Sequence, residues 1–107
     1  MMNYNHAHTI ERAIEAVKNQ VLLPYELIIA DDKSQDNSIE KIQTSIKDIS
    51  WIKLIANRKN LGNIGNANFL LNQVKTDYAI WASADDFLLF DIIQRYENYL
   101  KKYNEIG

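Results

Sequence analysis

The stretch Tyr78-Ala-Ile-Trp-Ala-Ser-Ala-Asp-Asp-Phe87 decides the fold prediction, because it joins an apolar run to two adjacent carboxylates. Residues Tyr78 to Ala82 are strand-forming and predict a buried β-strand. Asp85 and Asp86 follow directly, and an unpaired carboxylate is very costly to bury. We therefore expect both at the end of the strand, near water or near a cation. A hard cation such as Mg²⁺ prefers carboxylate oxygens and is usually held by one or two carboxylates plus a substrate's phosphates.

The composition is that of one small domain with an ordinary surface. The chain has 107 residues, 47% of them hydrophobic, so a substantial core is feasible. The formal net charge is −2, so no basic excess argues for nucleic acid as a partner. There are no cysteines, which excludes a disulfide scaffold and a thiol nucleophile and fits a cytoplasmic location. No apolar run approaches the roughly 20 residues that a membrane helix needs.

Two further apolar runs, Glu26–Ala30 and Trp51–Ala56, have the character of buried strands. Apolar residues at helical spacing predict four helices, one before the first strand, one after each of the first two strands and one after the last. The residues that mark them are Ile10, Ala13, Ile14 and Val17; Ile39, Ile42, Ile46 and Ile49; Ile64, Ala67, Leu71 and Val74; and Ile92, Ile93, Tyr96, Tyr99 and Leu100. We expect the second set to be a buried stripe, and Ile92, Tyr96 and Leu100 to be core. We expect Thr9 to cap the first helix and either Ser34 or Asp36 to cap the second.

The alternation of strand and helix predicts βαβ units with right-handed crossovers. We therefore predict an α/β fold of the Rossmann-like, three-layer α/β/α type with a mostly parallel sheet. Residues 1–8 are polar and are expected to form a loop. Neither end of the sequence resembles a domain boundary, so we expect residues 1–107 to be a single domain that is a fragment of a longer protein.

Polar loops follow all three predicted strands. They are Asp31-Asp-Lys-Ser34, Asn57-Arg-Lys-Asn60 and Ser83-Ala-Asp-Asp86. In an open parallel sheet, ligands bind outside the carboxyl ends of the strands. With the Tyr4-Asn-His6 loop, these segments can line a cleft for a polar ligand that carries phosphate.

The residue types suggest a division of roles within this cleft. Asp31 or Asp32 suits a donor-rich edge, such as a base N–H or a ribose hydroxyl. Tyr4 can stack on a flat ring. Asp85 and Asp86 can hold a metal ion that neutralises phosphates.

Six short segments, taken in order, carry a family resemblance. They are Tyr4-Asn-His6, Ile10-Glu-Arg-Ala-Ile14, Asn19-Gln20, Glu26-Leu-Ile-Ile-Ala-Asp-Asp-Lys-Ser34, Asn60-Leu-Gly62 and Ser83-Ala-Asp-Asp86. Each is weak alone, but the ordered set covers nearly the whole chain and resembles the nucleotide-binding half of the family-two glycosyltransferases. The resemblance implies a fold of the GT-A, nucleotide-diphospho-sugar transferase type, truncated here.

The resemblance also implies an activity: inverting, metal-dependent transfer of a hexose-like sugar (EC 2.4 class) from a nucleotide-sugar, often a UDP-sugar. It implies Mg²⁺ or Mn²⁺ as cofactor and a role in bacterial polysaccharide biosynthesis at the inner face of the membrane. The acceptor, a glycan or a lipid-linked molecule, stays open, as do a homodimer and peripheral membrane association of the full protein. The family's catalytic base and acceptor-binding half lie beyond this segment, so we expect the isolated chain to be inactive.

The resemblance assigns roles to individual residues of the nucleotide and metal sites. It implies Tyr4 beside the base, Asp32 on the uracil with Asp31 next to it, Asp85 at the ribose or metal and Asp86 at the metal-bound diphosphate, and we include Asn60 among the nucleotide-binding residues.

Three departures from the family pattern accompany these roles. Ser83 stands where the first Asp of a full Asp-x-Asp is expected, and Asn66-Ala-Asn68 stands where many members carry Arg. The family's first strand, an apolar run ahead of Tyr4, is not evident, so the sheet is expected to lack a central strand.

Other interpretations stay open. Asp85 and Asp86 would also suit a helix-capping turn, and Asp31–Asp32 a turn before an N-cap at Ser34. His6 and His8 are expected to be solvated loop residues rather than metal ligands. The chain could be a non-catalytic nucleotide-binding or assembly module. A receiver-like signalling domain is less favoured, because no later strand ends in the Lys that such a domain needs.

Overall fold

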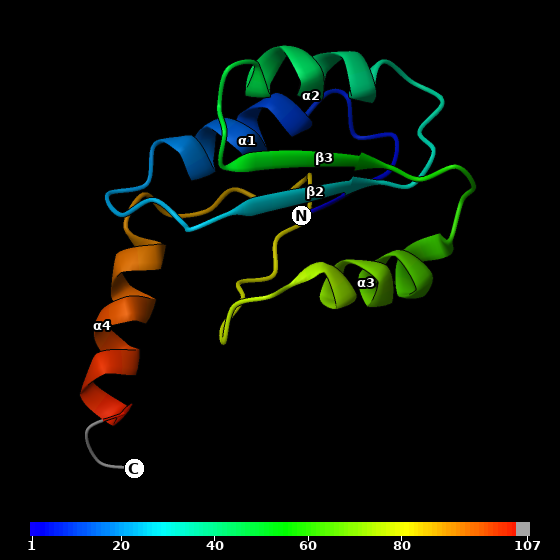
Figure 1. Ribbon diagram of the computed structural model, residues 1–107. Helices are drawn as coiled ribbons and strands as arrows, with labels where there is room; N and C mark the ends of the chain where they lie inside the picture. Colours follow the sequence, from blue (N-terminus) through cyan, green and yellow to red (C-terminus); the bar gives the residue numbers. More distant parts are fainter. Residues whose placement is uncertain (105–107) are drawn as a thin grey trace.

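A parallel sheet of three strands forms the centre of the fold (Figure 1). The structure is a computed structural model that describes residues 1–104. Its strands β1 (Met2–Asn3), β2 (Leu27–Asp31) and β3 (Ile52–Ala56) lie in the order β1-β2-β3. Both pairs are parallel, with Met2 opposite Ala30 and Leu27 opposite Ile52. The strands predicted over Glu26–Ala30 and Trp51–Ala56 are therefore confirmed.

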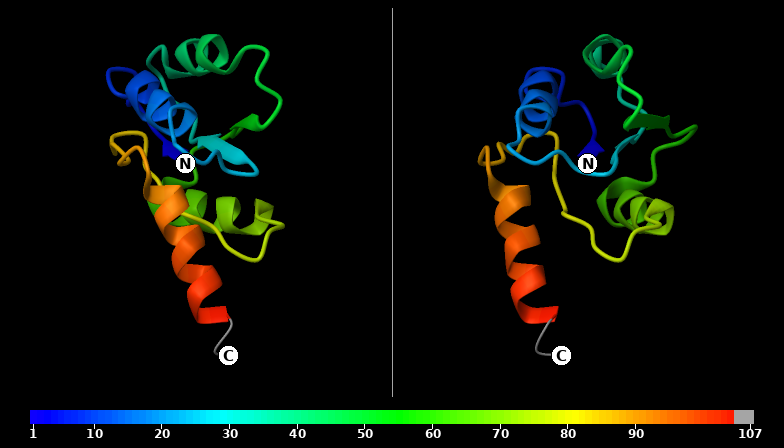
Figure 2. Two further views of the ribbon diagram at one scale, coloured as in Figure 1. Left: turned by 90° about the vertical axis from the view of Figure 1, so that its left-hand side faces the viewer. Right: turned by 60° about the vertical axis from the view of Figure 1, so that its left-hand side comes forward.

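Helices cover both faces of this sheet. α1 (Ile10–Lys18) and α2 (Ser38–Ile46) lie on one face, and α3 (Gly62–Gln73) lies on the other (Figure 1). α4 (Ile92–Asn104) extends away from the sheet (Figure 2). The predicted three-layer α/β/α arrangement is confirmed. Within the described residues, no helix has the length and apolar character needed to span a membrane.

The hydrophobic core lies mainly between the sheet and the α1–α2 layer. The predicted stripe of α1 is buried, and it packs with Ile29 of β2, Ile42 of α2 and Ile52 of β3. Each fully buried aliphatic side chain contributes about 1.5–3 kcal/mol relative to an exposed one. This packing fixes β2 firmly, and β2 ends in Asp31.

The first eight residues are more than the loop predicted from sequence. Met2 and Asn3 form β1, and the backbone of Met1 and Asn3 bonds to β2. On the other edge, Met2 exchanges backbone hydrogen bonds with Ala82 and Ala84. The expectation that a central strand is lacking is therefore wrong, because these two residues supply a short strand between β2 and residues 82–84.

The strand predicted over Tyr78–Ala82 does not form. Within the described chain, the one ladder contact of this region is the bridge between Met2 and Ser83. Ile80 and Trp81 are 40% and 47% exposed. The physical reason is that a strand needs a hydrogen-bonded neighbour along its length, and β1 is two residues long.

The helix predicted from Ile64, Ala67, Leu71 and Val74 forms as α3, but two of these residues are not on its buried face. Ile64 and Leu71 are 81% and 56% exposed, whereas Asn66 and Leu70 are buried. The helix is turned so that Asn66 Nδ2 donates a hydrogen bond to the carbonyl oxygen of Ala30 (3.2 Å). The face of α3 that packs against β2 therefore includes the polar side chain of Asn66, whereas Ile64 and Leu71 lie on the exposed face.

The stripe predicted for α4 is not core. Tyr96 and Tyr99 are 48% and 59% exposed. The helix forms as predicted, but it projects beyond the sheet, so its apolar side lies outside the main core (Figure 2).

The helix caps differ in part from expectation. Thr9 precedes α1 but makes no side-chain cap; its hydroxyl donates to the carbonyl oxygen of Ala84 (3.0 Å). Asp36, rather than Ser34, supports the start of α2, because Asp36 Oδ1 accepts from Ser38 N–H (3.0 Å).

Candidate functional site

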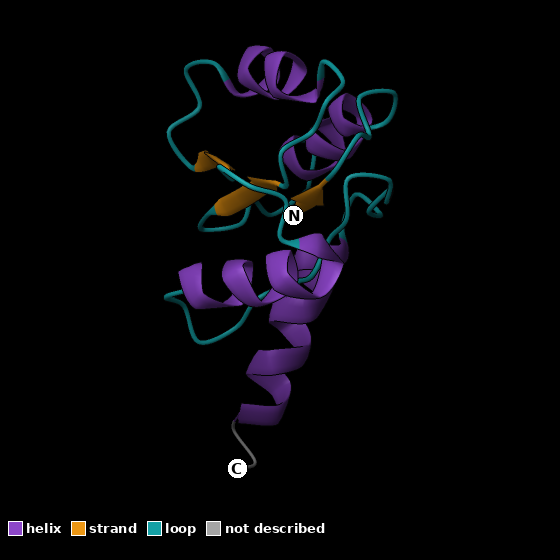
Figure 3. Cartoon of the chain, turned by 90° about the vertical axis from the view of Figure 1, so that its right-hand side faces the viewer, coloured by secondary structure: helices purple, strands orange, loops and turns teal. Residues whose placement is uncertain are grey.

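Polar loops meet at the carboxyl edge of the sheet, which Figure 3 presents toward the viewer. Three of these loops follow β1, β2 and β3, and the fourth follows the bridge at Ser83. Backbone bonds join neighbouring loops: Asp32 N–H donates to Asn3 O (2.9 Å), and Asn57 N–H donates to Asp31 O (2.8 Å). The structure therefore brings together the segments that the sequence placed at one edge.

Asp31 lies at the end of β2 and is 1% exposed. Its Oδ1 accepts from Asn3 Nδ2 (2.6 Å) and from the Ser34 hydroxyl (2.6 Å). Its Oδ2 accepts from Ser34 N–H (2.9 Å). These bonds hold a buried carboxylate and tie the loop after β1 to the loop after β2.

Asp32 is also buried, at 3% exposed, and it binds the start of α3. Its Oδ1 accepts from Leu61 N–H (2.7 Å) and Asn57 Nδ2 (3.1 Å), and its Oδ2 accepts from Gly62 N–H (2.9 Å). The first amide groups of a helix have no partner within the helix, and negative charge is favourable there. Asp32 therefore caps α3 from the loop that follows β2, and Oδ2 retains further acceptor capacity.

Asn60 shapes the turn that leads into α3. Its Nδ2 donates to Asp32 O (3.0 Å), and its Oδ1 accepts from Gly62 N–H (3.0 Å). Gly62 has a φ of +77°, which favours glycine. Asn60 is exposed, so the structure places it at the rim of the polar edge.

Tyr4 is 41% exposed and begins the loop that leads from β1 to α1. The next residue, Asn5, has a φ of +56°, a conformation that non-glycine residues adopt rarely. Asn5 Oδ1 accepts from Gln35 N–H (2.8 Å), which holds this strained position. Tyr4 is therefore accessible to a ligand, while the hydrogen bond of Asn5 to Gln35 holds the loop beside it.

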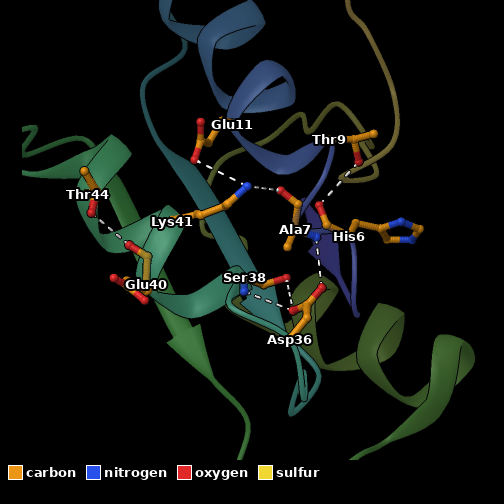
Figure 4. A network of polar contacts seen from close by, with 9 residues as sticks. All are labelled: His6, Ala7, Thr9, Glu11, Asp36, Ser38, Glu40, Lys41 and Thr44. Atoms are coloured by element: carbon orange, nitrogen blue, oxygen red, sulfur yellow. Dashed lines mark hydrogen bonds and ion pairs between the residues drawn. The ribbon is translucent and has the colours of Figure 1, made fainter.

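Figure 4 shows how the start of α2 holds the same loop. Asp36 Oδ2 accepts from Ala7 N–H (3.0 Å), and Lys41 Nζ donates to Ala7 O (3.0 Å). Desolvation acts to raise the pKa of Asp36, but the hydrogen bonds from Ser38 and Ala7 outweigh it and keep the pKa below 3.8. Asp36 is therefore an ionised acceptor at neutral pH.

Asp85 and Asp86 lie in an exposed turn after the Ser83 bridge. Asp86 Oδ2 accepts from Ser83 N–H (2.8 Å). A hydrogen bond from the Ser83 side chain lowers the pKa of Asp85 below 3.8; its own backbone N–H adds to this effect, weak desolvation opposes it, and nearby His6 and His8 lower the pKa further. The turn thus carries negative charge at neutral pH.

The carboxylate oxygens at this turn suit a metal ion that is also bound by the phosphates of a ligand. Within residues 1–104, no group of three or more His, Asp or Glu side chains is arranged to hold a metal ion. Mg²⁺ usually takes one or two carboxylates together with substrate phosphates and waters. The adjacent carboxylates of Asp85 and Asp86 fit that smaller role.

Three asparagines of this edge were given no individual role from sequence, although Asn57 lies in a segment predicted to line the cleft. Asn3 and Asn57 bind the carboxylates of Asp31 and Asp32, and Asn66 binds Asn57 Nδ2 through its Oδ1 (2.9 Å). A signal was available, because asparagine is disfavoured both in strands and in helix interiors. Asn3 and Asn66 are nevertheless placed in β1 and α3 and are buried.

A wide cleft lies elsewhere on the described part of the chain. It has a volume of 920 Å³ and is lined by residues at the amino end of β2, such as Leu27 and Ile28, by residues 78–82, and by parts of α3 and α4. Asp31 and Asp32 are at the opposite end of β2. We place the candidate site at the polar edge, because that edge carries the paired carboxylates and the accessible Tyr4.

The three-layer arrangement around a parallel sheet is the arrangement expected of the GT-A fold of glycosyltransferases. The family model "Glycosyl transferase family 2" matches residues 1–107, so the chain belongs to this family. The resemblance noted from the ordered sequence segments is thereby confirmed.

Curated relatives from several bacteria are similar along most of this chain. A GalNAc(5)-diNAcBac-PP-undecaprenol beta-1,3-glucosyltransferase of Campylobacter jejuni is 32% identical over 87 residues, which cover 80% of this chain and 28% of that protein. The Escherichia coli UDP-Glc:alpha-D-GlcNAc-diphosphoundecaprenol beta-1,3-glucosyltransferase WfgD is 30% identical over 104 residues, which cover 97% of this chain and 40% of that protein. The chain therefore spans less than half the length of these relatives.

A solved structure supports the same fold. Staphylococcus aureus TarS residues 1–349, crystallised in complex with UDP, matches 96% of this chain and 31% of its own chain with a TM-score of 0.85. At 18% sequence identity this likeness concerns the fold, and the predicted GT-A fold is confirmed.

Proposed function

We propose that this protein is the donor-binding portion of a glycosyltransferase that transfers a sugar from a UDP-sugar. The observation that carries the proposal is the convergence of Tyr4, the Asp31–Asp32 pair and the Asp85–Asp86 pair on one edge of the sheet. Family membership and the fold shared with a UDP-bound neighbour support it.

In this proposal, the nucleoside lies beside the loops that follow β1 and β2, at the carboxyl edge of the sheet. Tyr4 stacks beside the uracil, since its ring is accessible and its loop is fixed. Asp32 accepts a base N–H at Oδ2. This oxygen accepts one hydrogen bond from Gly62 N–H and has a second lone pair. Asp31 supports this contact from the adjacent position, and Asn60 borders the ligand at the rim.

The diphosphate lies at the Asp85–Asp86 turn. Asp86 faces the metal-bound diphosphate, and Asp85 faces the ribose or the metal. Bound Mg²⁺ or Mn²⁺ would stabilise negative charge on the departing nucleoside diphosphate. The low pKa of Asp85 keeps this side chain ionised and able to attract a cation at neutral pH.

We propose an inverting reaction, in which a base outside this chain removes a proton from an acceptor hydroxyl that attacks the anomeric carbon. The acceptor is a glycan or a lipid-linked molecule, in line with the undecaprenol-linked substrates named for two relatives. Such an acceptor would place the full protein in the cytoplasm at the inner face of the membrane. The isolated chain would bind donor and transfer nothing.

Calorimetry with UDP, with and without Mn²⁺, tests the proposal. We expect weak binding that strengthens when Mn²⁺ is present, and CDP serves as the control for recognition of the base. No heat from a folded sample at millimolar UDP with Mn²⁺ would contradict the proposed donor site.

A further inference from the structure

Ser34 occupies the centre of the contact between the loops that follow β1 and β2. Its hydroxyl donates to Asp31 Oδ1 (2.6 Å) and accepts from Asn5 N–H (2.9 Å) and Asn3 Nδ2 (3.2 Å). A serine hydroxyl has one donor and two acceptor positions, so all three are used here. Few side chains of this size could replace such a set of contacts.

These contacts lie on both sides of Tyr4. Asn3 precedes Tyr4 and Asn5 follows it, and both bond to the same hydroxyl. The positive φ of Asn5 makes this backbone unfavourable unless other contacts hold it. Ser34 therefore restrains the backbone on both sides of Tyr4, while Tyr4 itself remains 41% exposed.

The same hydroxyl also orients Asp31. Oδ1 of Asp31 is held by Ser34 and Asn3, and Oδ2 is held by the backbone N–H of Ser34. Without the Ser34 hydroxyl, Asp31 Oδ1 would keep only one of its two bonds named here, the one from Asn3 Nδ2. One residue thus couples the accessible aromatic ring to the buried carboxylate at the end of β2.

We infer that Ser34 is a positioning residue of the nucleoside subsite, where its hydroxyl fixes Tyr4 and Asp31 relative to a bound uridine group. This inference rests on the proposed function, because it concerns the base-binding end of that site. Ser34 acts through Tyr4 and Asp31 and does not itself contact the ligand. Its effect is confined to the nucleoside end, since Asp86 is held by Ser83 N–H on a different loop.

The test compares two probes, UDP and inorganic pyrophosphate, each titrated with Mn²⁺ into four proteins. These are the unmodified chain, Ser34→Ala, Ser34→Thr and Ser45→Ala. Ser45 is the matched control, because it is also partly exposed and lies near the far end of α2, away from the Tyr4 loop. If Ser34→Ala does not fold, Ser34→Cys replaces it, since it retains the volume with a much weaker donor.

We expect Ser34→Ala to weaken UDP binding about tenfold, the effect of losing one good hydrogen bond. Pyrophosphate binding should stay unchanged, Ser34→Thr should restore UDP binding, and Ser45→Ala should match the unmodified chain. Without ligand, hydrogen exchange at the Asn5 amide should be faster in Ser34→Ala alone.

Two results would overturn the inference. One is equal UDP binding by Ser34→Ala and the unmodified chain; the other is an equal loss of UDP and pyrophosphate binding, which would indicate a general structural defect. Failure of the unmodified chain to bind UDP is a separate outcome that removes the proposed function itself, and the positioning role with it.

Discussion

The two aspartate pairs of this chain are alike in sequence and opposite in environment. Asp31 and Asp32 are almost fully buried, and their carboxylates each accept three hydrogen bonds. Asp85 and Asp86 are exposed on a turn. A buried carboxylate is stable only when it is well bonded, so the first pair organises the loops around it. The second pair directs its charge toward solvent, where a cation and phosphates can approach.

The largest expected effect is the stability difference between Asp32→Ala and Asp85→Ala. Asp32→Ala removes three hydrogen bonds of a buried carboxylate, including the acceptor of Leu61 N–H and one of the two acceptors of Gly62 N–H, and we expect it to lower the free energy of unfolding by about 3 kcal/mol. Asp85→Ala should not change it measurably, because the side chain is exposed. Urea unfolding followed by circular dichroism measures both. Equal stability losses would contradict the contrast between the two pairs.

A second prediction concerns the buried Met1 amino group beside β2 and the dependence of stability on pH. Burial lowers the pKa of the Met1 amino group from 8.0 to about 6, and this group donates to Ile28 O (2.7 Å). Between pH 6 and pH 8 the unfolded chain binds more protons than the folded chain, so stability rises with pH. We expect a gain of about 2 kcal/mol across this window.

The control for this pH dependence is the same chain with an acetylated amino terminus, which cannot take up the proton. Thermal unfolding at pH 6 and pH 8 should differ for the free amine and not for the acetylated chain. A similar rise in both would assign the effect to other groups.

A third, smaller effect should appear in ligand binding rather than stability. Asp86→Ala and Asp85→Ala should each remove most of the Mn²⁺-dependent gain in UDP affinity, about tenfold, while the affinity without metal stays unchanged. Asp77→Ala is the matched control, because Asp77 is an exposed aspartate outside the proposed site. Calorimetry at pH 7 measures these differences. Unchanged Mn²⁺ dependence in both variants would remove the exposed pair from the metal site.

The fold was largely predictable from sequence where the pattern depends on local burial. Residues 27–30 and the stripe of α1 are apolar at the spacing of their elements, and both the strand and the helix form as predicted. Tyr78–Ala82 has the same apolar character but lacks a neighbouring strand along its length. Strand propensity describes a half-buried surface and cannot supply a partner.

The sequence predicted where in the fold the residues of the candidate site lie, but it did not predict their burial or their hydrogen bonds. The position of Asp31 and Asp32 at the end of an apolar run predicted that they lie at the carboxyl edge of the sheet, and the structure places them there. Their burial was not predictable, because the donors of Asp32 come from Leu61 and Gly62, distant in sequence. The rotation of α3 that buries Asn66 was missed for the same reason, since it depends on a contact with Ala30 in another element.

The most direct test of the account is a residue-resolved NMR titration of the chain with UDP and Mg²⁺. The account predicts amide shift changes at residues 3–6, 31–34, 57–62 and 83–86, with Tyr4 and Asp86 at opposite ends of the ligand. It predicts no comparable changes at Leu27, Ile28 or residues 78–81, which line the large cleft. Shifts centred on that cleft, with the carboxyl edge unaffected, would contradict the assignment of the nucleotide site.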